Sequence, residues 1–381
     1  MITRTKSLAG VALLASAAFV LTACAATEEA AVEETTTAAT EEAVEVSSLS
    51  GTLVGAGASS QGSAQEAWVA GFQTANPDVT VTYDPIGSGG GRETFQSGAS
   101  SFAGSDRAFK VDEITEGPFG SCVEEAGIWE IPAYISPIAI IFNLEGISSL
   151  NLDADTLAQI FTGEITNWND AAIASQNAGV DLPDLAITAV HRSDESGTTA
   201  NFTDYMSKAS TDFWLLAGEN AGSFEAWPAE WGGEGAPQTS GVVDAVTNGT
   251  GTIGYADASR AGSLGTVSVK VGSEYVPYSA EAAAKIVDAS PAANPGERGD
   301  NDLAIELDRA TEASGTYPIV LVSYLIGCND YVDDSVVDLV KGYVSYVVSE
   351  EGQLVAQANA GNAPISADSR AKAEAILASI K

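Results

Sequence analysis

Apolar and polar positions alternate in short segments along this chain from Leu53 onward. Segments with alternating or β-branched apolar residues predict strands, whereas longer segments with apolar residues on one helical face predict helices. Predicted strands lie at Leu53-Val54 and at 79–83, 102–106, 135–142, 187–190 and 317–326. Predicted helices lie around Trp68 and Phe72, after the glycines of 87–91, and at 152–162, 198–207 and 335–358. Strands that alternate with helices predict an α/β fold with helices on both faces of the sheets.

The length and the order of these segments also suggest where a ligand would bind. A chain of 381 residues is too long for one ordinary compact core, so we expect two domains. In α/β sheets, ligands bind beyond the carboxyl ends of the strands. Four loops follow predicted strands and carry polar residues suited to a ligand. They contain Ser59 and Ser60, residues 87–91, Asp106, and residues 191–199.

The first 24 residues predict export and lipidation. Arg4 and Lys6 precede an almost wholly apolar stretch at 8–23, which is too short to span a bilayer and is typical of a secretory signal. The stretch ends in Leu-Thr-Ala-Cys, which resembles a bacterial lipobox and predicts lipid attachment at Cys24. The alternative is an ordinary cleaved signal peptide, 1–23, followed by an incidental cysteine. The mature protein would be extracytoplasmic and held at the cell membrane by its lipid.

Residues 24–50 are predicted to form an acidic tether. They consist mainly of Ala, Thr, Glu, Ser and Val and contain no basic residue. Such a segment cannot bury enough apolar surface to fold, so we expect it to be disordered. A flexible chain of this length reaches about 30 Å, which suffices to hold a folded domain just off a membrane.

The formal charge is strongly negative, with 52 acidic residues against 16 basic ones and a net charge of -36. Removal of 1–23 deletes two basic residues and takes the charge to -38. This surface repels nucleic acid and anionic lipid head groups, so we expect neither as a partner. An anionic ligand would have to be held by local dipoles and hydrogen bonds, because distant surface charge is screened beyond about 8 Å.

Three of the four loops combine a strand end, small polar residues and a helix start. These are Ala58-Ser59-Ser60, the 87–91 loop with Ser88, and Ser196-Gly197-Thr198. Helix N-termini offer unpaired N–H groups and a positive dipole end to an oxyanion. Taken singly, each of these turns could equally be a plain helix N-cap.

Charged residues complete the candidate oxyanion site. Arg192 can grip an oxyanion with two hydrogen bonds, and Asp194 can hold its far side; the alternative is a surface ion pair. Asp106 would repel an anion unless it accepts a proton from it. Phosphate carries a proton near neutral pH and sulfate does not, so Asp106 would favour phosphate. The alternative for Asp106 is a simple helix N-cap.

Several motifs together resemble the phosphate-binding proteins of bacterial phosphate ABC importers. The similarity spans Leu53 to the C-terminus, with the motifs in the order of the family. The motifs at the loops are VGAGAS (54–59), IGSGGG (86–91), FAGSD (102–106) and RSDESGTT (192–199). The further motifs are LAQIFTG (157–163), NWND (167–170), WP (227–228) and GTIGY (251–255).

The resemblance implies a two-domain periplasmic-binding-protein-like fold, with an interdomain cleft and a hinge of crossing strands near 140–143 and 317–321. Domain I would comprise 51–140 and 318–381, and domain II 141–317. The resemblance also implies capture of inorganic phosphate for the permease and ATPase subunits of an importer, by a monomer without cofactor or metal. The implied phosphate-binding residues are Ser59, Ser60, Ser88, Asp106, Arg192, Ser196, Gly197 and Thr198, with Asp194 in support. The chain departs from the family at Ser60-Gln61, where an aromatic residue and a proline are usual.

The two cysteines that remain after export are Cys122 and Cys328. An exported protein with two remaining thiols usually pairs them, so we expect a disulfide; two buried free thiols are the alternative. In the fold that the resemblance implies, this disulfide would brace domain I at its returning strand.

Two other functional classes stay open at this point. His191, Asp194 and Ser196 list the residue types of a hydrolase triad, but they lie within six residues and no Gly-x-Ser-x-Gly elbow accompanies them. We therefore expect no enzyme, and His191, the only histidine, is expected to be structural rather than part of a zinc site. A surface adhesin or phosphate sensor is the third class. Among ligands, Asp106 disfavours sulfate and molybdate, whereas arsenate remains open.

Overall fold

The computed structural model describes residues 49–213 and 222–381. The predicted signal peptide 1–23, the predicted lipid attachment at Cys24 and the predicted tether as far as residue 48 lie outside the described residues. In the part of the chain that the structure describes, no helix is both long enough and apolar enough to cross a membrane.

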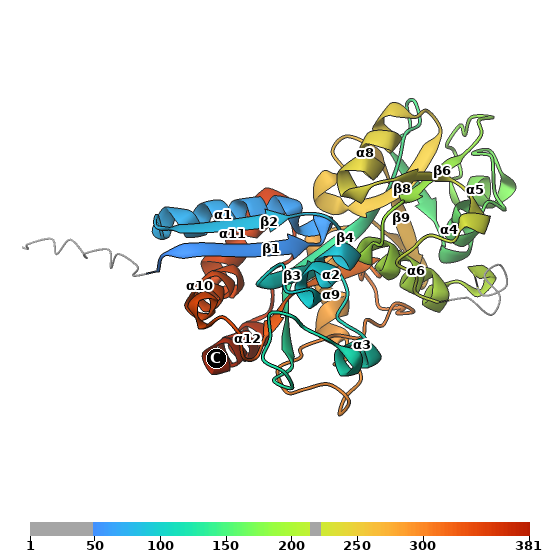
Figure 1. Cartoon of the computed structure of the whole chain (residues 1–381). Helices are drawn as coiled ribbons and strands as arrows, with labels where there is room; N and C mark the ends of the chain where they lie inside the picture. Colours follow the sequence, from blue (N-terminus) through green and yellow to red (C-terminus); the bar gives the residue numbers. More distant parts are fainter. Residues whose placement is uncertain (1–48, 214–221) are drawn as a thin grey trace, which may run out of the picture. The chain divides into compact units, whose positions relative to one another are not determined.

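The described strands form one sheet in the order β2-β1-β3-β11-β4-β8-β6-β7, with β9 on β4 and with β5 and β10 on β9 (Figure 1). We call the part from β2 to the start of β4 the first half of the sheet, and the part from the end of β4 onward the second half. Strand β1 pairs in parallel with β2 and β3, and β6 pairs in parallel with β7 and β8, whereas β11 is antiparallel to β3 and β4. The strands are β1 Gly51–Gly57, β2 Val79–Asp84, β3 Phe102–Ser105, β4 Ile128–Phe142, β5 Ser149–Leu152, β6 Thr188–Arg192, β7 Glu234–Ala236, β8 Thr252–Asp257, β9 Gly265–Val271, β10 Glu274–Val276 and β11 Val320–Cys328.

Strand β4 belongs to both halves of the sheet. Its residues 128–137 pair with β11, and its residues 138–142 pair with β8. All residues of β4 and of β11 are buried, because each strand is covered on both faces, and this explains their nearly continuous apolar sequence. The chain therefore crosses between the halves at Pro137-Ile138, slightly before the predicted crossing.

Helices cover both halves, and the predicted α/β class is confirmed. Many helices begin at a Ser or Asp whose side chain accepts a hydrogen bond from the first turn, as Asp153 and Ser279 do. The helices are α1 Gly62–Ala75, α2 Ser88–Gln96, α3 Val111–Glu116, α4 Ala154–Phe161, α5 Ala171–Gln176, α6 Gly197–Ala209, α8 Gln238–Asn248, α9 Ala280–Ala289, α10 Val337–Val348, α11 Glu350–Ala360 and α12 Ala367–Ser379, with 3-10 turns η1 Ser59–Gln61, η3 Ala229–Trp231, η4 Ala258–Arg260 and η5 Asp334–Val336.

The long helix predicted at 335–358 is wrong, because the chain breaks it at Ser349. Its N–H still bonds to the end of α10, while its Oγ accepts a hydrogen bond from the Gly352 N–H and caps the start of α11. Two glutamates in the first turn of α11 favour this new start. The break lets α11 lie against α1, where Trp68 Nε1 donates to the Gly352 carbonyl over 2.7 Å.

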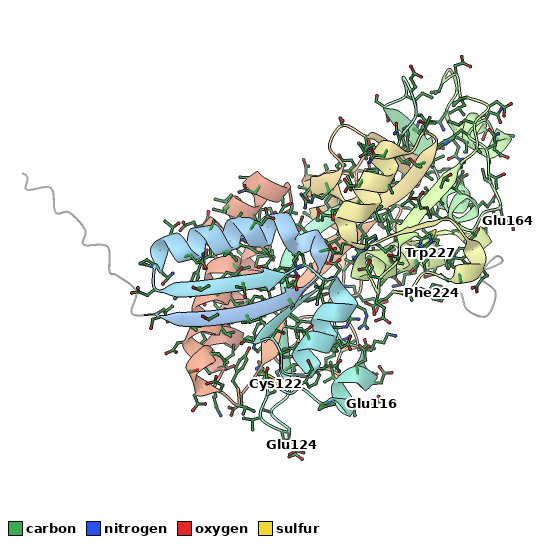
Figure 2. All side chains as sticks on the ribbon, turned by 45° about the horizontal axis from the view of Figure 1, so that its top comes forward. Glu116, Cys122, Glu124, Glu164, Phe224 and Trp227 are labelled. Carbon is green, nitrogen blue, oxygen red and sulfur yellow. A yellow bond between two sulfur atoms is a disulfide. The ribbon has the colours of Figure 1, made fainter. Side chains whose placement is uncertain are left out.

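Cys122 and Cys328 form a disulfide, as the two thiols of an exported chain predict. Their Cα atoms lie 5.1 Å apart, and they are separated by 206 residues. Cys328 is the last residue of β11, and Cys122, which Figure 2 labels, lies shortly before the start of β4. The bond therefore ties the returning strand to the segment that leads into the crossing strand.

The predicted domain boundaries at 140/141 and 317/318 remain predictions. The described residues 49–213 and 222–381 belong to one compact unit. Within this unit, the first boundary falls inside β4, which ends at Phe142, and the second falls just before β11, which begins at Val320.

A buried carboxyl group links β4 and β8 beside the crossing. Asp257 Oδ1 and Oδ2 accept hydrogen bonds from the Tyr134 hydroxyl over 3.0 and 3.1 Å. Burial raises the pKa of Asp257 to about 6, although the hydrogen bonds that its carboxylate accepts act in the opposite direction. An aspartate in an unfolded chain titrates near pH ~3.9, so the folded state binds this proton more tightly. The stabilisation by Asp257 is therefore complete below about pH 4 and is lost as the pH rises through about 6.

We expect Asp257→Asn to raise the free energy of unfolding relative to wild type at neutral pH, by up to about 3 kcal/mol. At about pH 4 the two proteins should differ little, because wild-type Asp257 is then neutral. Urea denaturation at both pH values measures the effect. Asp244→Asn, at an exposed position of α8, should show no such gain at neutral pH. A gain for Asp257→Asn that is the same at both pH values would contradict the titration.

Candidate functional site

The four loops named from the sequence meet in the structure. We call the loops after β1, β2 and β3 the first wall, and residues 192–199, from the last residue of β6 into the first turn of α6, the second wall. Each of the four loops follows the carboxyl end of a parallel strand. The walls touch directly, since the Gly89 N–H donates to the Glu195 carbonyl over 3.3 Å.

The carboxyl group of Asp106 accepts hydrogen bonds from three hydroxyl groups. Ser60 Oγ donates to Oδ1 over 2.5 Å, and Ser323 Oγ on β11 donates to the same oxygen over 2.6 Å. Thr198 Oγ1, from the second wall, donates to Oδ2 over 3.0 Å. Asp106 is only 3% exposed, and this burial raises its pKa, whereas the three hydroxyls and the positive charge of Arg192 act to lower it.

The main chain of Asp106 is also fixed by both walls. Its N–H donates to Ser88 Oγ over 3.1 Å, and its carbonyl accepts a hydrogen bond from Asn201 Nδ2 over 2.6 Å. Gly197 fits against this loop because it lacks a Cβ, which would lie 2.6 Å from Ser88 Oγ and 2.7 Å from Asp106 Cβ. The structure thus brings together Ser60, Ser88, Asp106, Gly197 and Thr198 of the predicted site.

Arg192 and Asp194 form a two-point ion pair inside the second wall. Arg192 Nε lies 2.8 Å from Asp194 Oδ1, and Nη2 lies 2.5 Å from Oδ2. Burial alone would raise the pKa of Asp194, but the hydrogen bonds and charge of Arg192 outweigh burial and lower it. Arg192 is only 3% exposed. The ion pair is therefore buried on the arginine side, and the alternative of a surface ion pair does not apply.

The remaining two predicted residues have neighbouring roles. Ser196 is the N-cap of α6, and its Oγ accepts a hydrogen bond from the Thr199 N–H over 3.2 Å. Ser59 lies beside the Asp106 cluster but bonds to the start of α8. Its Oγ is 3.1 Å from Thr239 Oγ1 and accepts from the Thr239 N–H over 3.2 Å. Ser59 therefore also joins the first wall to the second half of the sheet.

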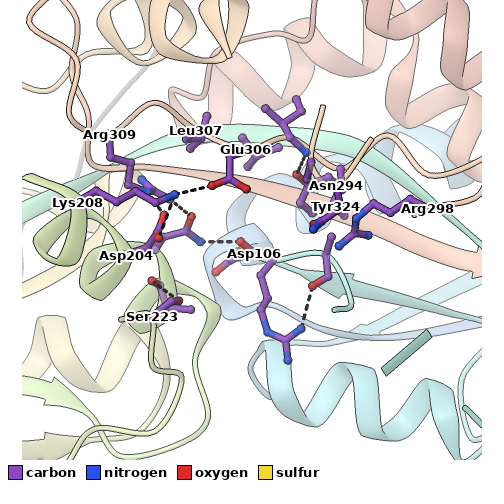
Figure 3. A pocket seen from close by; sticks show the side chains of 18 residues that line it. Asp106, Asp204, Lys208, Ser223, Asn294, Arg298, Glu306, Leu307, Arg309 and Tyr324 are labelled. Carbon is purple, nitrogen blue, oxygen red and sulfur yellow. Dashed lines mark hydrogen bonds and ion pairs between the residues drawn. The ribbon is translucent and has the colours of Figure 1, made fainter. Parts of the chain in front are cut away.

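A pocket of about 220 Å³ lies next to Asp106 (Figure 3). Arg309 donates a hydrogen bond to Asn201 Oδ1 in this pocket and forms an ion pair with Asp204 at 2.5 Å. The same guanidinium donates to the carbonyls of Pro318 and Val320 over 3.0 Å each. Arg309 therefore supports the asparagine that holds the main chain of Asp106.

A second charged cluster joins the walls outside the Asp106 cluster. Glu225 forms an ion pair with Arg92 of α2 at 2.6 Å and with Arg107, which follows Asp106, at 2.7 Å. The Glu225 carbonyl accepts a hydrogen bond from the Ser196 N–H over 3.1 Å, so Glu225 belongs to the second-wall side. Burial would raise the pKa of Glu225, but the two arginines outweigh burial and lower it.

His191 makes a different set of contacts from those of a catalytic base. Its ring stacks on Trp227, which Figure 2 labels, with the centroids 5.0 Å apart and the planes 11° from parallel. Its Nδ1 lies 2.9 Å from the Arg192 carbonyl oxygen. His191 lies on β6 rather than in a loop, and its partners are not Asp194 or Ser196. Among the described residues, no group of three or more His, Cys, Asp or Glu is arranged to hold a metal ion.

Sequence reasoning missed five residues that contact the site. These are Asn201, Glu225, Thr239, Arg309 and Ser323. Ser323 had a usable signal, because it is a polar residue inside an otherwise apolar buried strand. Glu225 and Arg309 had none, since a charged residue in a loop is ordinarily solvated.

The comparisons with known proteins agree with this geometry. The family model of the PBP superfamily domain matches residues 30–351, which gives the class of the chain. Two solved structures share the fold. They are a putative phosphate ABC transporter substrate-binding protein from Clostridium perfringens (TM-score 0.58, 20% identity, 83% of this chain and 100% of that one) and a phosphate-binding protein from Stenotrophomonas maltophilia (TM-score 0.62, 19% identity, 85% and 93%). The predicted two-domain periplasmic-binding-protein-like fold is therefore confirmed.

Similarity in sequence gives the family itself. Phosphate-binding protein PstS3 of Mycobacterium bovis is 34% identical over 347 residues, which cover 89% of this chain and 90% of the relative. Phosphate-binding protein PstS 2 of Mycobacterium tuberculosis is 32% identical over 352 residues, 90% of each chain. The chain belongs to the PstS family of phosphate-binding proteins.

The Glu225 cluster leads to a test of how firmly the walls are joined. We expect Glu225→Gln to lower the free energy of unfolding by about 3 kcal/mol, because it leaves two neighbouring guanidinium groups without their shared carboxylate. Urea denaturation of the full mature chain measures this change. Glu116→Gln, at the exposed end of α3, is the control and should change stability by less than about 0.5 kcal/mol. Equal effects of the two substitutions would show that the cluster contributes nothing.

Proposed function

We propose that this protein captures inorganic phosphate outside the cytoplasm and delivers it to an ABC-type importer. The observation that carries the proposal is the buried carboxyl group of Asp106. It lies among hydroxyl donors from both walls and within the field of the buried Arg192 guanidinium. The names of the PstS relatives and the family membership of the chain support the same ligand.

Phosphate would be held mainly by donors. We assign its binding to the eight residues predicted from the sequence, with Asp194 orienting Arg192. The first turns of α2 and α6 begin at Ser88 and Gly197, so that their positive dipole ends lie at the two walls. The hydroxyls of Ser60 and Thr198 can rotate from Asp106 toward a phosphate oxygen. These short-range contacts offset the acidic surface, whose field is screened beyond about 8 Å.

Asp106 would make the site selective for phosphate over sulfate. An ionised carboxylate can only accept hydrogen bonds, so it pairs with the hydroxyl of a protonated phosphate. Sulfate has no such hydroxyl near neutral pH. A sulfate oxygen and the Asp106 carboxylate, which both only accept hydrogen bonds, would then face each other. Sites of this kind reject the wrong ligand by factors of about 10⁴. Arsenate carries a proton as phosphate does, so this site gives no reason to exclude it.

Ser60 and Gln61 are compatible with a phosphate site. Where the family usually has an aromatic residue and proline, this chain places a hydroxyl on Asp106 and a buried amide at Gln61. We propose that Ser60 supplies both its N–H and its hydroxyl to the site, and that the departure alters the affinity rather than the choice of ligand.

The remaining parts of the proposal concern assembly. We propose that 51–140 with 318–381 and 141–317 form two lobes that close on phosphate, with β4 and β11 at the hinge. The protein would act as a monomer without cofactor, anchored through lipid at Cys24, and would dock on a permease with its ATPase subunits. We propose no enzymatic activity, since the partners of His191 and Ser196 serve structure. A phosphate-binding adhesin or sensor would have the same binding site. Permease and ATPase genes next to the gene for this protein would favour the importer over these two alternatives.

Arg192 provides a sharp test of the site. We expect Arg192→Ala to weaken phosphate binding roughly a hundredfold, because it removes a buried charge-assisted donor. Isothermal calorimetry on the protein that lacks its lipid anchor measures the affinity. Arg260→Ala removes an equal charge at an exposed position of η4 and should leave the affinity within about twofold. An unchanged affinity in Arg192→Ala would place the phosphate elsewhere.

The choice of ligand is tested on the wild-type protein. After removal of any bound ligand, we expect phosphate to bind at least about a thousandfold more tightly than sulfate in the same calorimeter. Tight sulfate binding together with weak phosphate binding would overturn the proposed function.

A further inference from the structure

A row of buried side chains leads from α10 to the carboxyl group of Asp106. The Tyr343 hydroxyl donates to Gln65 Oε1 over 2.6 Å, and Gln65 Nε2 donates to Gln61 Oε1 over 2.8 Å. Gln61 Nε2 donates to Ser323 Oγ over 2.6 Å, and Ser323 Oγ donates to Asp106 Oδ1 over 2.6 Å. All five residues are at most 3% exposed, so water does not substitute for these contacts.

One main-chain carbonyl fixes the direction of the whole row. Gln61 Nε2 also donates to the Tyr324 carbonyl over 3.2 Å. A carbonyl oxygen can only accept, so the amide of Gln61 must present its nitrogen to Tyr324 and to Ser323. The opposite amide orientation would set two acceptor oxygens against each other in a buried place, at a cost of about 1–3 kcal/mol. The amide of Gln65 must then face Gln61 with its nitrogen as well.

This direction leaves the Ser323 hydroxyl with a single role. Its oxygen receives a hydrogen from Gln61, and it has only one hydrogen of its own to give. That hydrogen points to Asp106 Oδ1. A protonated Asp106 with its hydrogen on Oδ1 would face the hydrogen of Ser323, without an acceptor. Ser60 and Thr198 differ, because their hydroxyls have no second contact in the described residues that fixes their rotation.

We propose that Gln61 and Ser323 are positioning residues that hold Asp106 Oδ1 as a hydrogen-bond acceptor, favour the ionised carboxylate, and thereby set the discrimination against oxyanions that carry no proton. The inference rests on the proposed phosphate site. It also gives a role to the buried amide of Gln61, because a residue without a side-chain donor at this position could not hold Ser323 in this way.

The other charged and titratable groups around Asp106 do not donate a hydrogen bond to its carboxyl group. Arg192 on the second wall acts on Asp106 through its charge alone. Tyr83 on β2 bonds to the Ala58 carbonyl over 3.0 Å, and Arg107 bonds to carboxylates of other residues. Burial raises the pKa of Asp106, and Ser323 is the first of the hydrogen bonds that lower it, so loss of Ser323 would raise the pKa further.

Sulfate is the ligand used in the test, because it allows the protonation of Asp106 to be followed without a change in the protonation of the ligand. Phosphate changes its own protonation near neutral pH, whereas sulfate keeps its full charge between about pH 4 and 8. A protonated Asp106 can donate to sulfate, so sulfate binding should appear as the pH falls through the pKa of Asp106. The midpoint of this appearance therefore reports the protonation of Asp106 in each variant.

We expect Ser323→Ala to raise this midpoint by about one pH unit, which corresponds to the loss of one hydrogen bond. Gln61→Met, which releases Ser323 to rotate, should shift the midpoint in the same direction by a smaller amount. Calorimetric titration with sulfate across the pH range measures both. Ser210→Ala is the matched control, because it removes a buried serine hydroxyl that donates to another carboxylate, Asp155, over 2.7 Å. Its midpoint should equal that of the wild type.

An unchanged midpoint, or a midpoint at lower pH, in Ser323→Ala would overturn the inference. This result is distinct from failure of the proposed function, in which the wild-type protein itself would not bind phosphate tightly. A shift of equal size in Ser210→Ala would also overturn it, because the effect would then follow from any loss of a buried hydroxyl.

Discussion

Asp106 places a carboxyl group where little water reaches it, and much of the surrounding structure serves to make that position tolerable. A buried charge is costly unless it is hydrogen-bonded. Here Ser60, Ser323 and Thr198 donate to the carboxylate, while Ser88 and Asn201 hold its main chain. These five partners come from η1, from the start of α2, from α6 and from the returning strand β11. The correct position of Asp106 therefore requires the whole arrangement of the two walls.

The sheet provides that arrangement through a strand that is shared by its two halves. Because β4 pairs with β11 and then with β8, the loops of the first wall are held in register with those beyond β6. The disulfide ties the end of β11 to the approach to β4, and the Asp257–Tyr134 contact ties β8 to β4. Local contacts, and not the overall charge, thus define the electrostatics of the site in a protein with a net charge of -36.

The sequence predicted those features that local patterns determine. Glycines, serines and an aspartate at strand ends located both walls, and the apolar runs located β4 and β11. Ser349 was misjudged because its capping role competes with a helical pattern on both sides of it. Glu225, Thr239, Arg309 and Ser323 were missed because each contacts a residue of the site that lies more than 90 residues away along the chain. The pairing of distant residues depends on the crossing of β4, which no local pattern specifies.

The most direct measurement compares phosphate with sulfate on Asp106→Asn and on the wild-type protein, by calorimetry at one pH near 7.5. An amide has the shape of the carboxyl group but can donate a hydrogen bond to sulfate. If Asp106 chooses the ligand as an obligate acceptor, the ratio of phosphate to sulfate affinity should fall at least about a hundredfold in the variant, mostly through a gain in sulfate binding. A ratio that stays at its wild-type value would show that another group makes the choice.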